Sequence, residues 1–262
     1  MKTCLRKADA LIWDPKKSVR NSELSGKHWD EKRKINNKKR KLADLAAGQP
    51  RLLISEENII GGFKDLMNGP NREMIYPKAI ERLTRLAQLV APNPLHIAMA
   101  VREPCSYYVS VYNQLLMSGR FQTWERFSKG LDPTAVKWSD ILRPMTKIPG
   151  VAQVSIWRYE DYHRVFPQVL DALLGQPRPE IPSLLEKPMH IGLSEQAVNA
   201  CCTWHAAGYG GRLGAVARED SPISDTYPKF APWPEELVRE SKAAYGQDID
   251  ALGRAHEITV LE

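Results

Sequence analysis

Cysteine is scarce in this sequence, and the spacing of the few cysteines argues against both a disulfide framework and a zinc site. There are four cysteines in 262 residues, at positions 4, 105, 201 and 202, and no pair has C-x-x-C spacing. Cys201 and Cys202 are adjacent and poorly placed to bridge each other. The six histidines are scattered without ligand spacing. We therefore expect no metal site and a protein of the reducing cytoplasm.

Long apolar runs are also absent. No stretch of eighteen apolar residues occurs, and no signal-peptide core is recognisable. The sequence therefore predicts no transmembrane segment. The apolar fraction of 43% is adequate for a full core. The length fits one large α/β domain over residues 1–262.

Common catalytic signatures are missing as well. The chain contains no G-x-S-x-G nucleophile elbow, no G-x-G-x-x-G dinucleotide loop and no H-E-x-x-H zinc motif. These absences give no support to an α/β-hydrolase, a dinucleotide-dependent oxidoreductase or a zinc protease.

Positive charge is concentrated near the N-terminus. The first fifty residues hold 14 Lys and Arg against 6 Asp and Glu, whereas the rest of the chain has a balance of −2. Most of the excess lies in the segment 31–41, which reads EKRKINNKKRK. Such a block binds an anionic partner or forms a solvated helix face. It lacks the interleaved aromatics of a nucleic-acid site.

Three apolar runs predict buried strands, and helical patterns lie between and after them. The strands are expected at 51–55, 95–101 and 151–157, with helices at 28–47, 76–90, 104–117, 162–174 and 237–252. Residues 1–12 are expected to be helical and residues 208–234 to form a long loop. Strands joined by such long connections pair in parallel. We therefore predict a three-layer α/β fold with a mainly parallel sheet flanked by helices.

The most informative segment follows the second of these strands. It reads V-R-E-P-C-S-Y-Y-V-S-V-Y-N over residues 101–113. Arg102 ends the strand, and the helix that begins near Pro104 carries Ser110 and Tyr112. A guanidinium beside a helix N-terminus is suited to binding an oxyanion. The alternative is an ordinary strand–turn–helix junction with a surface arginine.

This segment resembles the 3′-phosphate-binding segment of sulfotransferases that use 3′-phosphoadenosine 5′-phosphosulfate (PAPS). In that family an arginine ends a strand in an R-[DE]-P turn, and a serine eight residues later binds the 3′-phosphate, often with a tyrosine two residues on. Arg102, Ser110 and Tyr112 match these positions. Later segments match in order, including R-Y-E-D-Y at 158–162 and the closing helix with Tyr245. The resemblance is strongest to bacterial carbohydrate sulfotransferases.

One family feature has no counterpart. The loop P-K-[TG]-G-[TS]-[TS], which holds the 5′-phosphosulfate between the first strand and first helix, does not occur in the sequence. Residues 1–13 resemble the helix that follows this loop. The resemblance therefore implies that the domain is N-terminally incomplete, beginning just after the first strand and its loop. A shortened gene, a misplaced start and a lost activity would each account for this.

The resemblance implies a P-loop NTPase-like sulfotransferase fold and transfer of a sulfuryl group from PAPS to a hydroxyl of a carbohydrate or similar acceptor, without a metal. Glu57, in the segment S-E-E-N at 55–58, is then the expected general base, and Glu56 is the second choice. His28 is a further candidate, because cytosolic members use a histidine. Each of these three residues could instead have a purely structural role.

In the family a loop near residues 208–234 covers the nucleotide, so Arg212 and Arg218 are candidates for phosphate contacts. With Arg102, Ser110 and Tyr112, they complete the expected site for PAPS or for its product 3′-phosphoadenosine 5′-phosphate (PAP). A different function is a catalytically inactive sulfotransferase-like protein that binds a polyanion or a protein partner through residues 31–41. The sequence leaves the acceptor and the oligomeric state open.

Overall fold

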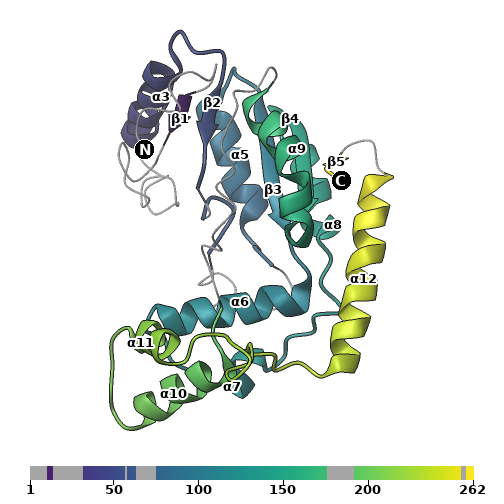
Figure 1. Cartoon of the computed structure of the whole chain (residues 1–262). Coiled ribbons are helices and arrows are strands. Elements are labelled where there is room, and N and C mark those ends of the chain that lie inside the picture. The colour runs from purple at the N-terminus through teal and green to yellow at the C-terminus, as the bar shows by residue number, and fades with distance from the viewer. Residues whose placement is uncertain (1–10, 14–31, 57, 63–74, 176–191, 255–257) are drawn as a thin grey trace. The chain divides into compact units, whose positions relative to one another are not determined.

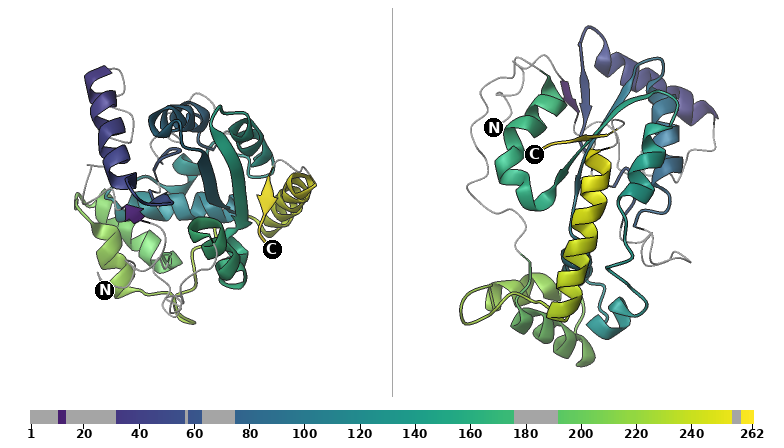
Figure 2. Two further views of the ribbon diagram at one scale, coloured as in Figure 1. Left: turned by 90° about the horizontal axis from the view of Figure 1, so that it is seen from above. Right: turned by 90° about the vertical axis from the view of Figure 1, so that its right-hand side faces the viewer.

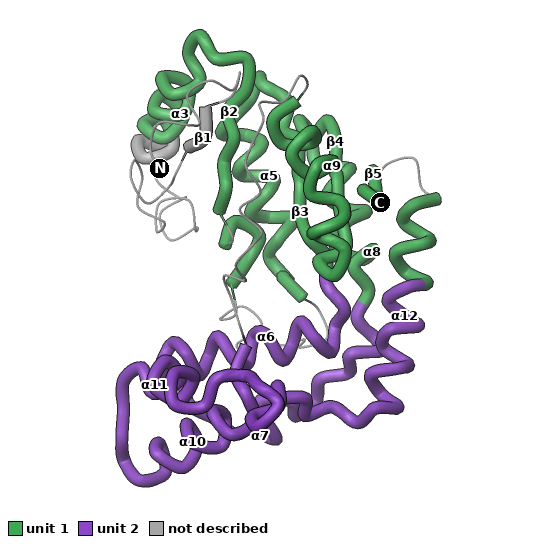
Figure 3. Tube along the Cα trace, viewed as in Figure 1, with its two compact units in different colours: residues 1–101, 137–182, 247–262 green, residues 102–136, 183–246 purple. Residues whose placement is uncertain are grey.

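The computed structural model describes the chain except for residues 1–10, 14–31, 57, 63–74, 176–191 and 255–257 (Figure 1). The described residues form two compact units, each assembled from separate stretches of the sequence (Figure 3). Unit 1 contains residues 1–101, 137–182 and 247–262, and unit 2 contains residues 102–136 and 183–246.

Unit 1 contains a three-stranded parallel sheet. β3 (Leu95–Val101) pairs with β4 (Val151–Arg158), which pairs with the short β5 (Thr259–Val260). Val101 lies opposite Arg158 in the register, so β3 and β4 end at the same edge of the sheet. The predicted strands at 95–101 and 151–157 and their parallel pairing are confirmed.

Helices cover both faces of this sheet (Figure 2). α9 (Tyr162–Leu174) packs Val165 and Val169 on the face of β3 and β4 that bears Trp157. On the other side α8 (Ser139–Thr146) contacts β4 and α5 (Ala79–Val90). Because side chains alternate along a strand, Val154 and Ile156 face away from α9 and are fully buried. The mixed α/β class and the flanked parallel sheet are therefore confirmed.

A second, two-stranded parallel sheet corrects the expectation for the N-terminal residues. β1 (Leu11–Trp13) pairs with β2 (Leu52–Ile54), although residues 1–12 were expected to be helical. The expectation of a helix is therefore wrong for Leu11 and Ile12, whereas residues 1–10 lie outside the described residues. α3 (Lys32–Ala46) packs beside this sheet, with Leu42 against Leu89 of α5.

Unit 2 consists mainly of helices around α6 (Pro104–Met117). The others are α7 (Trp124–Ser128), α10 (Glu195–Ala206) and α11 (Leu213–Asp220). α11 lies inside the stretch 208–234, which was expected to be a loop. Ser194 begins α10, as its hydroxyl accepts a hydrogen bond from the amide of Ala197 at 3.1 Å. α12 (Glu235–Gly253) contributes its first residues to unit 2 and its last to unit 1.

Candidate functional site

The turn between β3 and α6 has the geometry that the R-E-P sequence predicts. β3 ends at Val101, which is fully buried, and α6 begins with Pro104 at its first position. Proline is favoured there because its missing N–H would have no helical partner. Arg102 thus lies between the carboxyl end of a buried strand and the first turn of a helix.

Glu103 caps α6 from inside unit 2. Its side chain is 5% exposed and accepts hydrogen bonds from the amides of Cys105 at 2.9 Å and Ser106 at 2.8 Å. The hydroxyl of Ser241 donates a third bond at 2.6 Å. We expected the first-turn amides of α6 to help bind an anion. That expectation is wrong for these two amides, because the Glu103 carboxylate already occupies them.

Arg102 is held over the first turn of α6 by a residue that the sequence reasoning missed. Its Nε donates to Ser106 Oγ at 3.0 Å, and this hydroxyl donates to the carbonyl of Glu103 at 2.9 Å. Both side chains are half-buried. The spacing offered a signal, because Ser106 lies four residues after Arg102 and four before Ser110.

Ser110 lies one turn beyond Ser106 on the same face of α6. Residues four and seven apart share a helix face, so Ser106, Ser110 and Asn113 form one polar stripe along α6. Ser106 and Ser110 are half-buried, whereas Asn113 is 7% exposed. Arg102 thus lies at the start of this α6 stripe, bonded to Ser106, and Ser110 lies one turn farther along it.

Tyr112 lies elsewhere. It is fully buried, and its hydroxyl donates to the carbonyl of Gln122 at 2.9 Å. Its ring contacts Trp124, Phe127 and Phe230 at centroid distances of 5.2 to 5.7 Å. Burial raises the pKa of the Tyr112 phenol, which therefore stays neutral. Tyr112 belongs to the aromatic core of unit 2, which corrects its assignment to a nucleotide site.

Arg212 also lies away from Arg102. Gly214, two residues later, packs against the backbone of Leu116, and the carbonyl of Gly211 lies beside Gly119. The start of α11 therefore lies at the C-terminal end of α6. A helix of 14 residues is about 21 Å long, so α6 separates Arg212 from Arg102 by most of that length. Arg212 therefore does not lie beside Arg102, and its assignment as a phosphate contact stays a prediction.

Arg218 lies in the last turn of α11 and is half-buried. The eight residues of α11 begin at the end of α6 that is distant from Arg102. No described contact joins Arg218 to the α6 stripe, so its assignment to the phosphate site stays a prediction.

Of the three candidate bases, Glu56 is described. It follows β2 and is half-buried, and its Oε1 accepts from the backbone and side-chain amide nitrogens of Asn58 at 3.1 and 3.2 Å. These bonds form a local turn that fixes the carboxylate beside the end of the strand. Glu57 and His28 lie outside the described residues.

The basic segment forms a helix with an uncompensated exposed face. In α3, Lys39, Arg40 and Lys41 are exposed, and none of them has an ion pair with the described residues. The first turn holds no acidic residue, although the helix dipole favours negative charge there. The opposite face packs through Leu42. That an anionic partner binds this surface of α3 stays a prediction.

The thiols of Cys105 and Cys201 are buried in the protein interior. Burial raises the pKa of Cys105 to about 12 and that of Cys201 to about 11, so neither is a thiolate at neutral pH. Among the described residues, no group of three or more His, Cys, Asp or Glu could hold a metal ion. The helices in the described ranges include none long and apolar enough to cross a membrane.

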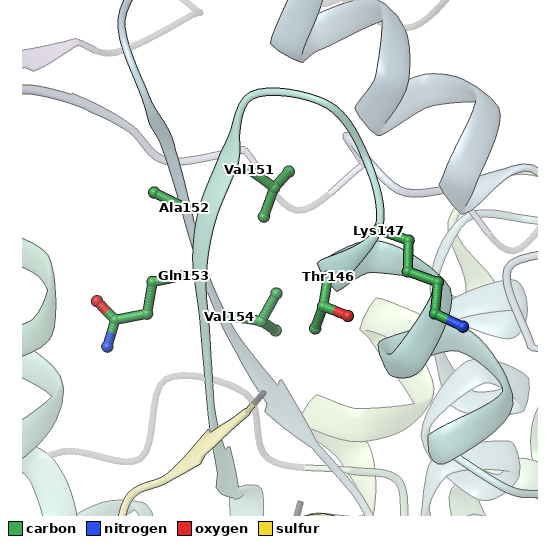
Figure 4. A pocket seen from close by; sticks show the side chains of 6 residues that line it. All are labelled: Thr146, Lys147, Val151, Ala152, Gln153 and Val154. Carbon is green, nitrogen blue, oxygen red and sulfur yellow. The ribbon is translucent and has the colours of Figure 1, made fainter. Parts of the chain in front are cut away.

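A shallow cavity of about 250 Å³ lies in unit 1, away from the predicted site residues (Figure 4). It sits at the amino end of β4, whereas ligands of parallel sheets bind at the carboxyl ends. Lys147 points away from the strand. The lining residues are Thr146, Lys147, Val151, Ala152, Gln153 and Val154. None of them is a candidate site residue.

Comparisons of the chain with models of known families, with curated proteins and with solved structures give no match. The functional argument therefore depends on the residues and their geometry.

Proposed function

We propose that the chain is a member of the PAPS-dependent sulfotransferases and transfers a sulfuryl group to a hydroxyl of a carbohydrate or a similar acceptor. The observation that supports this most directly is the arrangement of Arg102, Ser106 and Ser110. An arginine at the end of β3 is held by one serine, and a second serine follows one turn later on the same helix face. Arg102 and Ser110 are the residues that the R-E-P segment predicted for a 3′-phosphate site, and Ser106 adds the bond that positions the arginine.

The chemistry of these side chains suits a phosphate. A guanidinium presents N–H donors in a planar fork that suits two phosphate oxygens, and the Nε of Arg102 is fixed by its bond to Ser106. The hydroxyl of Ser110 can donate to a phosphate oxygen, whereas the Ser106 hydroxyl already donates to the carbonyl of Glu103. Partial burial strengthens such charge-assisted bonds, which contribute about 1.5–3 kcal/mol each. Ser106 therefore serves to position Arg102, from which it accepts a hydrogen bond.

The transfer step needs in-line placement of the acceptor and a base for its proton. The acceptor oxygen forms a bond to sulfur as the bond from sulfur to the 5′-phosphate oxygen breaks, and PAP leaves. The hydroxyl proton passes to a carboxylate, for which we propose Glu57, with Glu56 or His28 as alternatives. The residues described at α6 account for the 3′-phosphate half of the donor site.

We extend the proposal to the fold and to the location of the protein. The flanked parallel sheet of unit 1 is compatible with a P-loop NTPase-like sulfotransferase fold, in which nucleotides bind at the carboxyl ends of strands. The thiols of Cys105, Cys201 and Cys202 are free, as in proteins of the reducing cytoplasm. We therefore propose a cytoplasmic protein.

Calorimetric titration with PAP tests this function. We expect the whole chain to bind PAP with a micromolar Kd. The affinity of Arg102→Ala should be lower by about tenfold to a hundredfold, because the charge-assisted hydrogen bonds from the guanidinium to the phosphate are removed. Arg126→Ala, which removes an exposed arginine of unit 2, serves as the matched control and should bind like the wild type. Absence of PAP binding by the wild type, or equal losses in both variants, would refute the proposal.

The α3 surface favours a second candidate function, that of a catalytically inactive protein that binds a polyanion or an acidic protein partner. The observation behind it is the exposed charge of Lys39, Arg40 and Lys41, which form no ion pair with any residue that the structure describes. Retention on a heparin column should then fall steeply with salt and be lost when all three are changed to glutamine. Unchanged retention of the triple variant would exclude the α3 surface as the binding site.

A further inference from the structure

The turn between α10 and α11 exposes an aromatic ring on a fixed backbone. Tyr209 is 63% exposed, the highest value among the large apolar side chains that the structure describes. The amide of Gly208 donates to the carbonyl of His205 at 3.0 Å, and the amide of Tyr209 donates to the carbonyl of Trp204 at 3.0 Å. With a φ of +89° at Gly208, these two bonds form a Schellman motif at the end of α10. The exposed ring therefore projects from a backbone that hydrogen bonds hold in place.

The glycine that follows Tyr209 is not required by the fold. A Cβ added to Gly210 would meet no atom within 4 Å, and the φ of Gly210 lies outside the left-handed region. Neither packing nor backbone conformation therefore demands a glycine here. Glycine is also used where a ligand approaches the backbone closely. The open space over Gly210 gives a ligand access to the backbone beside Tyr209.

The turn that follows α6 lies next to the turn that follows α10. A Cβ added to Gly119 would lie 2.7 Å from the carbonyl oxygen of Gly211, so the two backbones touch. Residues 118–121 and 205–212 thus form one surface of unit 2 at the C-terminal end of α6, which we name the double-turn surface (Figure 1).

The double-turn surface has positive charge and no carboxylate of its own. Arg120 and Arg212 are both exposed. The sequence contains no Asp or Glu in residues 104–124 or in residues 196–218, which are the stretches that carry the two turns. Charge complementarity therefore favours an anionic partner.

The rings on this surface favour a sugar chain over a strand of nucleic acid. Phe121 and His205 stack at a centroid distance of 4.8 Å with 23° between the ring planes, so each ring covers one face of the other. Single strands are bound by several aromatic rings on which successive bases stack. One exposed tyrosine beside two arginines instead suits an anionic sugar unit. Its C–H groups can pack on the negative face of the Tyr209 ring, and its acidic groups can pair with the guanidinium groups.

We propose that the double-turn surface binds an anionic polysaccharide, with a sugar ring on Tyr209 and acidic groups of the chain at Arg120 and Arg212. The inference names the acceptor class of the proposed function, and it rests on that function for its catalytic meaning. Arg102 lies at the other end of α6, which is about 21 Å long, so this surface holds the chain at a distance from the nucleotide. Arg212 then contacts the acceptor instead of the nucleotide.

Calorimetric titration of the whole chain with oligosaccharides of hyaluronan, which carry carboxylates, and of heparin, which also carry sulfates, tests the proposal. We expect Tyr209→Ala to bind about threefold to tenfold more weakly than the wild type, because one aromatic contact is lost. Gly210→Leu should give a similar loss, because its side chain would occupy the open space. Arg212→Gln should reduce the salt dependence of the affinity. Tyr159→Ala removes a 48% exposed tyrosine of unit 1 and, as the matched control, should bind like the wild type.

The outcomes separate this proposal from the others. Failure of the wild type to bind either oligosaccharide, or equal binding by the wild type, Tyr209→Ala and Gly210→Leu, would overturn it. A Tyr209-dependent preference for a thymidine oligonucleotide would overturn it in favour of single-stranded nucleic acid. The α3 charges are present in every variant, so a loss confined to Tyr209→Ala and Gly210→Leu locates the binding in unit 2. Titration with PAP is a separate measurement, whose failure refutes the proposed function and leaves the polysaccharide surface standing.

Discussion

The cap that Glu103 makes on α6 gives the most quantitative prediction. Changing Glu103 to alanine removes the acceptor of three hydrogen bonds, from the Cys105 and Ser106 amides and from the Ser241 hydroxyl. Ser241 is fully buried, and its remaining acceptor is the Pro133 carbonyl at a long 3.5 Å. Hydrogen bonds to a charged group contribute about 1.5–3 kcal/mol each, and stranded donors add a penalty, although such contributions are not additive. We expect Glu103→Ala to lower the free energy of unfolding by about 4 kcal/mol.

Urea unfolding followed by circular dichroism measures this loss, and amide hydrogen exchange locates it. Protection of the Cys105 and Ser106 amides should fall in Glu103→Ala, while amides in the middle of α6 change only by the global loss. Ser241→Ala should cost less, about 1–2 kcal/mol, because Glu103 keeps both amide bonds. In the double variant the two losses should not add.

A loss below about 1 kcal/mol in Glu103→Ala would refute this reasoning. Such a value is typical of a solvent-exposed cap, whose donors turn to water when the carboxylate is removed. It would mean that the start of α6 is open to solvent. The first-turn amides would then be available to an anion after all.

Three further predictions concern unit 2. Asn113→Leu should leave the free energy of unfolding unchanged or raise it by about 1 kcal/mol, because it removes Oδ1, a buried acceptor without a hydrogen-bond partner among the described residues. A loss above about 2 kcal/mol in urea unfolding would contradict this. Burial raises the pKa of Cys105 in the folded protein from 9.0 to about 12, so the contribution of the thiol to stability is complete below pH 9 and is lost as the pH rises from 9 toward 12. Alkylation of this thiol at pH 9 should therefore be slow until the chain unfolds. Rapid labelling of the native protein would count against burial. Gly119→Ala should lower the stability of the protein by about 2 kcal/mol or more in thermal unfolding, because φ is +77° at this glycine and the new Cβ would lie 2.7 Å from the carbonyl oxygen of Gly211. An unchanged Tm would show that the segments around Gly119 and Gly211 do not touch.

The regular elements could largely be predicted from the sequence, because local signals set their bounds. The apolar run 95–101 became β3, and Pro104 began α6 where proline is favoured. β1 was missed because three apolar residues, Leu11–Trp13, are too few to show a period. Only its pairing with β2, forty residues later, makes it a strand.

The site residues were harder to predict, because their roles depend on contacts distant in sequence. Arg102 and Ser110 could be placed near each other, because Arg102 lies just before α6 and Ser110 lies on that helix. Tyr112 has the same local neighbourhood, yet Phe230 and Gln122 bury it in the aromatic core. The position of Arg212 at the other end of α6 follows from the packing of Gly214, which no local pattern reveals.

Because each unit is assembled from separate stretches of the sequence, the order of synthesis on the ribosome limits when unit 1 can fold. In unit 1 the amide of Ser139, in the middle of the chain, donates to the carboxylate of Asp248 at 3.1 Å, and β4 pairs with β5 at 259–260. Unit 1 therefore stays incomplete until residues 259–260 have been synthesised, which is later than β3, β4 and the whole of unit 2. Until β5 has been made, this edge of β4 is uncovered, and an uncovered strand edge can pair with another chain.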